Sequence, residues 1–270
     1  MNKNILILLI ISSLNLFAFS DYDMDGVEDK SDKCPNTSFS ELVDINGCTT
    51  ESLASPHHFD IIFGMDYAET NYATLEKSDT ITKTLQLDYY YDDFSLQAIV
   101  SHYNSTSTTS KNSGINDSFL GAYYSIKPDD KLTVRLGGGI IVPTYDDELN
   151  NNNTDYTASL NLSYMLDNVN LFGGYGYTIV TDDDISNSVT YQNTNSYSIG
   201  IGFYPKEKLY VSASYNSSDS IYVGVDKINT ASIYAFYTID ENWFSNFSYA
   251  RGLSDTASDN SISFKLGYYF

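Results

Sequence analysis

From residue 57 to the end of the chain, apolar and polar side chains alternate at every second position. In FDIIFGMDY, Phe59, Ile61 and Phe63 point to one side of an extended chain, while Asp60 and Gly64 point to the other. SYSIGIGFY at 196–204 and SISFKLGYYF at 261–270 repeat the pattern, and three-four helical spacing is almost absent. A period of two predicts strands with one apolar and one polar face, so this body of the chain is expected to be all-β.

Twelve segments of this kind follow one another, each close to or slightly longer than the 9–11 residues with which a tilted strand crosses a bilayer. Tight turns, such as Asp92-Asp93, alternate with long polar stretches, such as NSTSTTSKNSG at 104–114, which is expected to be a loop. Short turns at one end, long loops at the other and an even strand count are typical of an antiparallel up-and-down outer-membrane barrel. The expected strands are 58–68, 81–91, 94–103, 115–126, 131–143, 155–166, 168–180, 191–204, 208–217, 228–239, 242–251 and 260–270.

The composition of the two faces indicates which one meets lipid. The polar face is mostly Ser, Thr, Gly and Asn, as expected for the lining of an aqueous lumen. Aromatic residues gather at the ends of the apolar stripes, as in the girdles of membrane barrels; examples are Tyr67, Tyr156, Tyr177, Trp243, Tyr268 and Phe270. A soluble β-sandwich or up-and-down barrel, with the apolar face inside, is the alternative.

Both ends of the sequence point to export. Residues 1–20 have Lys3, an apolar run and small residues at 18 and 20, which predicts a signal peptide that is cleaved before Asp21. The last strand resembles the C-terminal signal of bacterial outer-membrane proteins, with Leu266, Tyr268 and Phe270 at alternate positions. That resemblance implies recognition by the barrel-insertion machinery, and contact with outer-membrane lipid and lipopolysaccharide.

The charge balance excludes one class of partner. Lys and Arg number 14 against 35 Asp and Glu, a net charge of −21, which argues against binding nucleic acid. The abundance of Tyr and Phe argues against a disordered chain. The two cysteines, Cys34 and Cys48, are expected to form one disulfide in an exported protein.

The stretch DYDMDGVEDKSD at 21–32 has oxygen ligands at the spacing of a calcium loop. Counted from Asp21, carboxylates occupy positions 1, 3, 5, 9 and 12, Gly occupies position 6, and position 7 can offer a backbone carbonyl. So many carboxylates in a short loop are tolerable when a cation neutralises them. The expected Ca²⁺ ligands are Asp21, Asp23, Asp25, Val27, Asp29 and Asp32. A solvated acidic tail is the alternative.

The wider motif DxDxDGVxDxxDxCP, with VDINGC ending at Cys48, resembles the thrombospondin type 3 repeat. Such repeats serve as calcium-binding linkers in proteins related to the outer membrane protein A family, and the resemblance implies the same role here. A single repeat is present, with no peptidoglycan-binding domain behind it. We therefore expect three parts: a signal peptide at 1–20, a calcium-binding module at 21–55 in the periplasm, and a barrel at 56–270.

The expected lumen suggests a function. Its small lining residues would leave a passage for small solutes in a twelve-stranded barrel, which is wider than the filled eight-stranded kind. The charges that would set selectivity are Asp60, Asp66, Asp88, Arg135 and Lys265. A porin-like passage is therefore the leading hypothesis, and a non-conducting structural or surface-interaction barrel is the alternative. A barrel esterase using His102 and Ser118 ranks third, and we do not expect an enzyme.

Overall fold

A computed structural model describes residues 21, 23, 26–37, 43, 45–48, 57–70, 77–145, 153–184 and 189–270. The expected signal peptide at 1–20 and the proposed calcium ligand Asp25 lie outside the described residues. The strands are β1 (His57–Thr70), β2 (Ser78–Tyr91), β3 (Phe94–Ser107), β4 (Lys111–Ile115), β5 (Ser118–Ile126), β6 (Leu132–Val142), β7 (Asp155–Leu166), β8 (Val169–Ile179), β9 (Thr194–Lys206), β10 (Leu209–Ser218), β11 (Ile228–Thr238), β12 (Trp243–Gly252) and β13 (Asn260–Tyr269).

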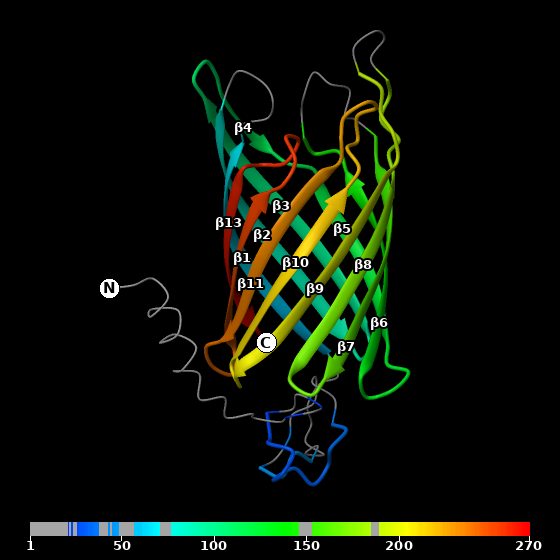
Figure 1. Ribbon diagram of the computed structural model, residues 1–270, viewed down its shortest axis with the longest axis vertical. Coiled ribbons are helices and arrows are strands. Elements are labelled where there is room, and N and C mark those ends of the chain that lie inside the picture. The colour runs from blue at the N-terminus through cyan, green and yellow to red at the C-terminus, as the bar shows by residue number, and fades with distance from the viewer. Residues whose placement is uncertain are drawn as a thin grey trace, which may run out of the picture.

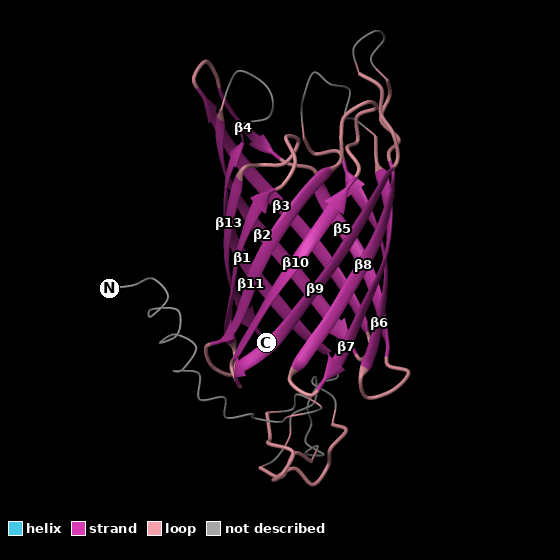
Figure 2. Ribbon diagram, in the orientation of Figure 1, coloured by secondary structure: helices cyan, strands magenta, loops and turns pink. Residues whose placement is uncertain are grey.

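These strands form one closed antiparallel barrel (Figures 1 and 2). Successive strands pair with each other except β4 and β5, β1 pairs with β13, and the pairing of β2 with β3 completes the ring. β4 and β5 both pair with β3, one after the other, so together they occupy one strand position in the barrel wall, which is interrupted at Asn116 and Asp117. The barrel therefore has twelve strand positions, and the expected fold class, an antiparallel β-barrel, is confirmed.

The prediction that residues 104–114 form a loop is wrong. Residues 104–114 continue the wall instead: β3 runs to Ser107 and β4 starts at Lys111, so only 108–110 turn. The stretch is polar on both faces, because Asn104 and Thr106 project outward where the lower part of β3 carries Leu96 and Val100. Backbone pairing and side-chain hydrogen bonds such as that between Ser107 Oγ and Ser110 Oγ (3.0 Å) hold this hairpin, and apolar–polar alternation cannot reveal it.

The two ends of the barrel differ as expected. At one end, here called the short-turn end, β2–β3 and β7–β8 are joined by two residues each, with Asp92 and Asp167 at positive φ (48° and 53°), as tight hairpins require. In the β11–β12 turn, the amides of Asn242 and Trp243 donate to Asp240 and hold the pKa of that carboxyl below its ordinary value. The opposite, long-loop end carries longer connections such as 180–193.

The wall is apolar outside and polar inside. Only Ile62, Met165 and Ala257 are buried apolar residues among those described, whereas large apolar side chains cover the outer surface; Phe63 is 62% exposed and Ile199 is 67% exposed. Exposed aromatic residues gather near both ends of the outer surface. Towards the long loops they are Tyr67, Tyr156, Tyr175, Tyr197 and Tyr215, and towards the short turns Phe94, Tyr124, Phe203, Tyr237, Trp243 and Phe270. A soluble barrel would show the reverse, so the soluble alternative is rejected.

The last residues of the chain close the barrel seam. Phe59 N donates to Phe270 O (2.8 Å), and Phe270 N donates to Phe59 O (3.0 Å). Leu266 pairs with Phe63, Tyr268 pairs with Ile61, and the rings of Phe59 and Phe270 stack at 5.8 Å. The three residues of the expected insertion signal thus lie on the outer surface beside β1.

The described part of the N-terminal segment lies beyond the short-turn end, at the same end of the barrel as the C-terminus (Figure 1). The expected Cys34–Cys48 disulfide is present. Thr37 is buried and ties the two cysteine-bearing stretches together, because its hydroxyl contacts the carbonyls of Cys34 (2.9 Å) and Gly47 (2.6 Å). No helix in the described part of the chain is both long and apolar enough to span a membrane.

The assignment of faces predicts opposite effects at two adjacent positions in the middle of β9. Ile199→Lys places a charge in hydrocarbon and is expected to destabilise the folded barrel by about 2–4 kcal/mol. Ser198→Lys, the matched control, places the same charge in the lumen and is expected to cost far less. Denaturant unfolding in lipid vesicles measures both; equal costs would contradict the assignment.

Candidate functional site: the barrel lumen

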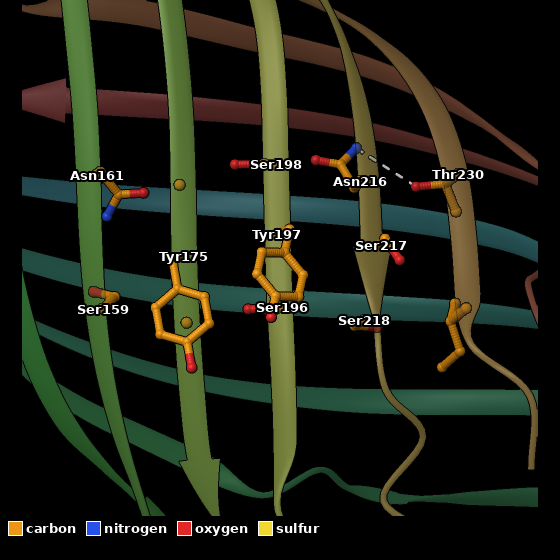
Figure 3. A pocket seen from close by; sticks show the side chains of 13 residues that line it. Ser159, Asn161, Tyr175, Ser196, Tyr197, Ser198, Asn216, Ser217, Ser218 and Thr230 are labelled. Atoms are coloured by element: carbon orange, nitrogen blue, oxygen red, sulfur yellow. Dashed lines mark hydrogen bonds between the residues drawn. The ribbon is translucent and has the colours of Figure 1, made fainter.

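The half of the lumen nearer the long loops is lined by hydroxyls and amides. Part of this wall, on β7 to β11, encloses a cavity of 280 Å³ (Figure 3). Asn216 Nδ2 lies 3.1 Å from Ser232 Oγ and 3.5 Å from Thr230 Oγ1, so the amide links two strands. Inward residues of this cavity are Ser159, Asn161, Ser196, Ser198, Asn216, Ser218 and Thr230. Such a surface offers many donors and acceptors and no net charge.

Nearer the short turns, one side of the lumen carries a hydrogen-bonded network centred on Asp88. Asp88 is buried, and its two oxygens accept from Gln86 Nε2 (2.7 Å) and Gln97 Nε2 (3.0 Å). Gln97 Oε1 in turn accepts from the Tyr123 hydroxyl (3.2 Å). The network spans β2, β3 and β5 and fixes a carboxylate to the wall.

Arg135 and Asp60 flank this network. The Arg135 guanidinium lies 4.1 Å from the centre of the Tyr123 ring and donates to Ser95 Oγ (3.1 Å). No ion pair between Arg135 and a carboxylate occurs among the described residues. Asp60 is directly opposite Asp88 in the β1–β2 register, and its Oδ1 is buried without a hydrogen-bond partner. Like charges opposite each other are unfavourable, so a cation would be favoured at this position.

Aromatic rings line the other side. The ring centres of Tyr204 and Tyr210 lie 5.0 Å apart, those of Tyr210 and Tyr234 lie 6.3 Å apart, and Phe236 stacks on Phe244 at 5.5 Å. In the strand order β3, β5, β6, β7, β8, β9, β10, six steps separate β10 from β3. Six steps are half of a ring of twelve strand positions, so β10 faces β3 across the barrel. Aromatic surface faces the Asp88 network across the lumen.

Several inward rings are paired across strands with a glycine. Tyr123 is opposite Gly137, Phe172 is opposite Gly200, and Phe244 is opposite Gly267. A Cβ on Gly137 would lie 2.6 Å from Tyr123 Cδ1, so the ring occupies the space that a side chain would fill. The rings can thus lie along the wall, which leaves more of the lumen cross-section for solutes.

All five charges expected in the lumen lie on its inward face. Asp66 and Lys265 line a second cavity, of 360 Å³, together with Asn246 and Ser248, and Thr84 Oγ1 lies 3.4 Å from Asp66 Oδ2. They belong to a different part of the lumen from Asp60, Asp88 and Arg135. The contact between Gln97 and Asp88 could not be predicted from the sequence, because it depends on the register of β2 against β3, whereas Gln86 and Asp88 are two residues apart on the same strand.

The described residues of the acidic stretch are bent in the manner a cation loop needs. Gly26 has a φ of +92°, and its amide donates to Asp21 Oδ2 (2.9 Å). One oxygen each of Asp23 and Asp32 accepts a backbone amide, from Thr37 (2.6 Å) and Cys34 (2.7 Å) respectively. The other oxygen of each is buried and has no hydrogen-bond partner. Within the described residues, no three His, Cys, Asp or Glu side chains are grouped to hold a metal.

The esterase hypothesis finds no geometric support. His102 is exposed on the outer surface, where it pairs with Lys83 and Ile115, and its Nδ1 lies 3.5 Å from Asn104 Nδ2. Ser118 Oγ is 2.9 Å from Thr144 Oγ1. Among the described residues, no hydrogen bond joins His102 to Ser118.

Comparison with known proteins agrees with the fold. The family model described as "Putative MetA-pathway of phenol degradation" matches residues 58–270. An outer-membrane channel from Pseudomonas putida F1 has a TM-score of 0.65 and 12% identity, over 82% of this chain and 97% of that chain. The NanC porin has a TM-score of 0.51 and 15% identity, over 78% of this chain and 98% of that chain. No curated protein matches the sequence. The chain therefore has the all-β, closed antiparallel barrel fold of known outer-membrane channels.

Proposed function

This chain belongs to the family described as a putative MetA-pathway of phenol degradation, and we propose that it is a porin-like outer-membrane passage for small solutes. The observation that carries the proposal is the polar interior: Ser, Thr, Asn and Gly line a barrel whose described part buries only three apolar residues. The likeness to an outer-membrane channel over 82% of the chain supports it.

The orientation follows from the two ends. Short turns lie in the periplasm and long loops outside the cell in bacterial outer-membrane barrels. We infer a periplasmic N-terminal module from the same orientation, because its described part lies beyond the short-turn end. Solutes then enter along the hydroxyl and amide wall and leave between the Asp88 network and the Tyr204–Tyr210–Tyr234 rings. Lipid, lipopolysaccharide and the insertion machinery are the partners of the outer surface, with Leu266, Tyr268 and Phe270 as the insertion signal.

Conduction through the lumen is tested by recording from the refolded protein in planar bilayers. We expect discrete conductance steps from the native chain. Ser198→Trp narrows the lumen and is expected to lower the step size, whereas Ile199→Trp, next to it on the lipid side, is expected to leave it unchanged. A folded native barrel that gives no steps would favour the alternative of a non-conducting surface-interaction barrel.

The lumen charges are expected to set ion selectivity. Asp60→Asn with Asp88→Asn removes both facing carboxylates and lowers the permeability of K⁺ relative to Cl⁻, because fewer negative charges attract cations. Arg135→Gln acts in the opposite direction. Reversal potentials in a KCl gradient measure the ratio, with Glu241→Gln, in a short turn outside the lumen, as the control. Unchanged ratios in both variants would remove these residues from the selectivity site.

We also propose that the module at 21–55 binds one Ca²⁺ through Asp21, Asp23, Asp25, Val27, Asp29 and Asp32. The buried oxygens of Asp23 and Asp32 that lack hydrogen bonds support it, since a buried carboxylate oxygen without a partner is costly unless a cation neutralises it. The ion would supply a centre that holds a module too small for an apolar core, together with the disulfide.

Limited proteolysis tests the calcium proposal. Calcium at about a hundred times its dissociation constant stabilises its bound state by about 2.7 kcal/mol, which lowers the fraction open to protease about a hundredfold. Asp23→Ala with Asp25→Ala is expected to abolish this protection. Glu28→Ala, which removes a carboxylate outside the ligand spacing, is the matched control and is expected to keep it. Equal cleavage of the native module in calcium and in chelator would contradict calcium binding.

A further inference from the structure

A third cavity lies on the inward side of the long-loop end, away from the Asp88 network. It measures 560 Å³ and is lined by Thr80, Thr82, Tyr103, Ser105, Asn112, Asn116, Asp117 and Tyr145. We propose that it is a binding site for a neutral sugar at the outer entrance of the lumen. The proposal is independent of conduction, because it concerns binding alone.

Two tyrosine rings form one side of the cavity. The ring centres of Tyr103 and Tyr145 lie 5.6 Å apart at an interplanar angle of 45°, and their hydroxyls are 3.5 Å apart. Tyr103 is directly opposite Gly114, and a Cβ there would lie 3.1 Å from the Tyr103 ring. The glycine therefore lets the ring pack against the β4 backbone while Tyr103 lines the cavity.

The loop residue Tyr145 is held in place by its neighbours. Its amide donates to Asp117 Oδ1 (3.0 Å), in the gap between β4 and β5. The preceding residue, Thr144, donates its hydroxyl to Asn116 O (2.7 Å), and Asn116 Nδ2 donates to Ser101 Oγ (2.8 Å). The gap between β4 and β5 thus makes Asn116 and Asp117 available to hold the Tyr145 segment, which fixes the Tyr145 ring beside the Tyr103 ring.

The remaining lining residues are hydroxyls, amides and one carboxylate. Thr80 Oγ1 donates to Ser105 Oγ (2.9 Å), which leaves acceptor capacity on both. Within the described residues, the side chains of Thr82 and Asn112 have no hydrogen-bond partner. Six of the eight lining residues therefore offer hydrogen-bonding groups around a pair of rings.

This combination matches a sugar better than a simple aromatic solute. A sugar ring presents one face of C–H groups, which packs on an aromatic ring, and a rim of hydroxyls that needs several donors and acceptors. A phenol has one hydroxyl and would leave most of the polar groups unpaired, at a cost in affinity. The lining carries Asp117 and no Lys or Arg, so an acidic sugar is disfavoured.

Maltose is the probe, and saturation-transfer NMR on the full chain refolded in detergent micelles is the measurement. We expect transfer from the protein to maltose ring protons. Tyr103→Ala and Tyr145→Ala are each expected to weaken maltose binding about tenfold, the upper range for loss of one ring contact. Tyr124→Ala, on the outer surface of β5 and 52% exposed, is the matched control and is expected to bind as the native chain does.

Tyr145→Ala changes a residue outside the strands, so its folding is not at risk, and the heat-dependent mobility of the barrel on gels checks each variant. No transfer to maltose from the folded native chain would overturn the proposal, and so would maltose binding unaffected by both Tyr variants. Phenol binding with the same dependence on Tyr103 and Tyr145, in the absence of maltose binding, would overturn the ligand class. Maltose binding by a barrel that does not conduct would support this site and contradict the proposed passage.

Discussion

The rest of this structure depends on the closure of the sheet. In hydrocarbon, an unpaired backbone amide or carbonyl has no water to bind, so a membrane-spanning sheet must have no free edge. The seam between β1 and β13 meets this requirement with a continuous register from Asp60–Tyr269 to Glu69–Asn260, and Phe59 and Phe270 add two backbone hydrogen bonds beyond it. Once the ring is closed, the position of each residue along its strand decides whether the side chain meets lipid or the lumen.

Closure also explains why so acidic a chain can sit in a membrane. The protein does not collect its apolar side chains in a core; they form the outer surface, and the polar ones form the interior. Within the barrel, charges are then admissible where the lumen or the ends provide water, and Asp60, Asp66, Asp88, Arg135 and Lys265 all lie on the inward side. Calcium, if bound by the N-terminal module as proposed, would neutralise part of the remaining excess of carboxylates outside the membrane.

The sequence was sufficient for the barrel because period-two alternation carries both the strand and the face of each residue. It failed at 104–114, where both faces are polar and the wall continues by backbone pairing without an apolar face. It also placed Asp88 on the inward face without revealing that Gln97 links it to Tyr123, because Gln97 contacts residues 9 and 26 positions away in the sequence. Tyr145 could not be recognised, since its ring meets Tyr103 only through a loop that the alternation does not describe.

On the proposed function, we infer that the two ends of the lumen respond to different properties of a solute. At the long-loop end, the Tyr103–Tyr145 rings and the surrounding hydroxyls and amides respond to shape and to hydrogen-bonding groups. Near the short turns, Asp60, Asp88 and Arg135 respond to charge, and the facing tyrosines supply an apolar contact. If the lumen is the proposed passage, separating the two sites along it would let each bind weakly, so that a solute is selected twice without being held tightly. The glycines opposite the rings make this possible, because they keep aromatic side chains along the wall rather than across the lumen.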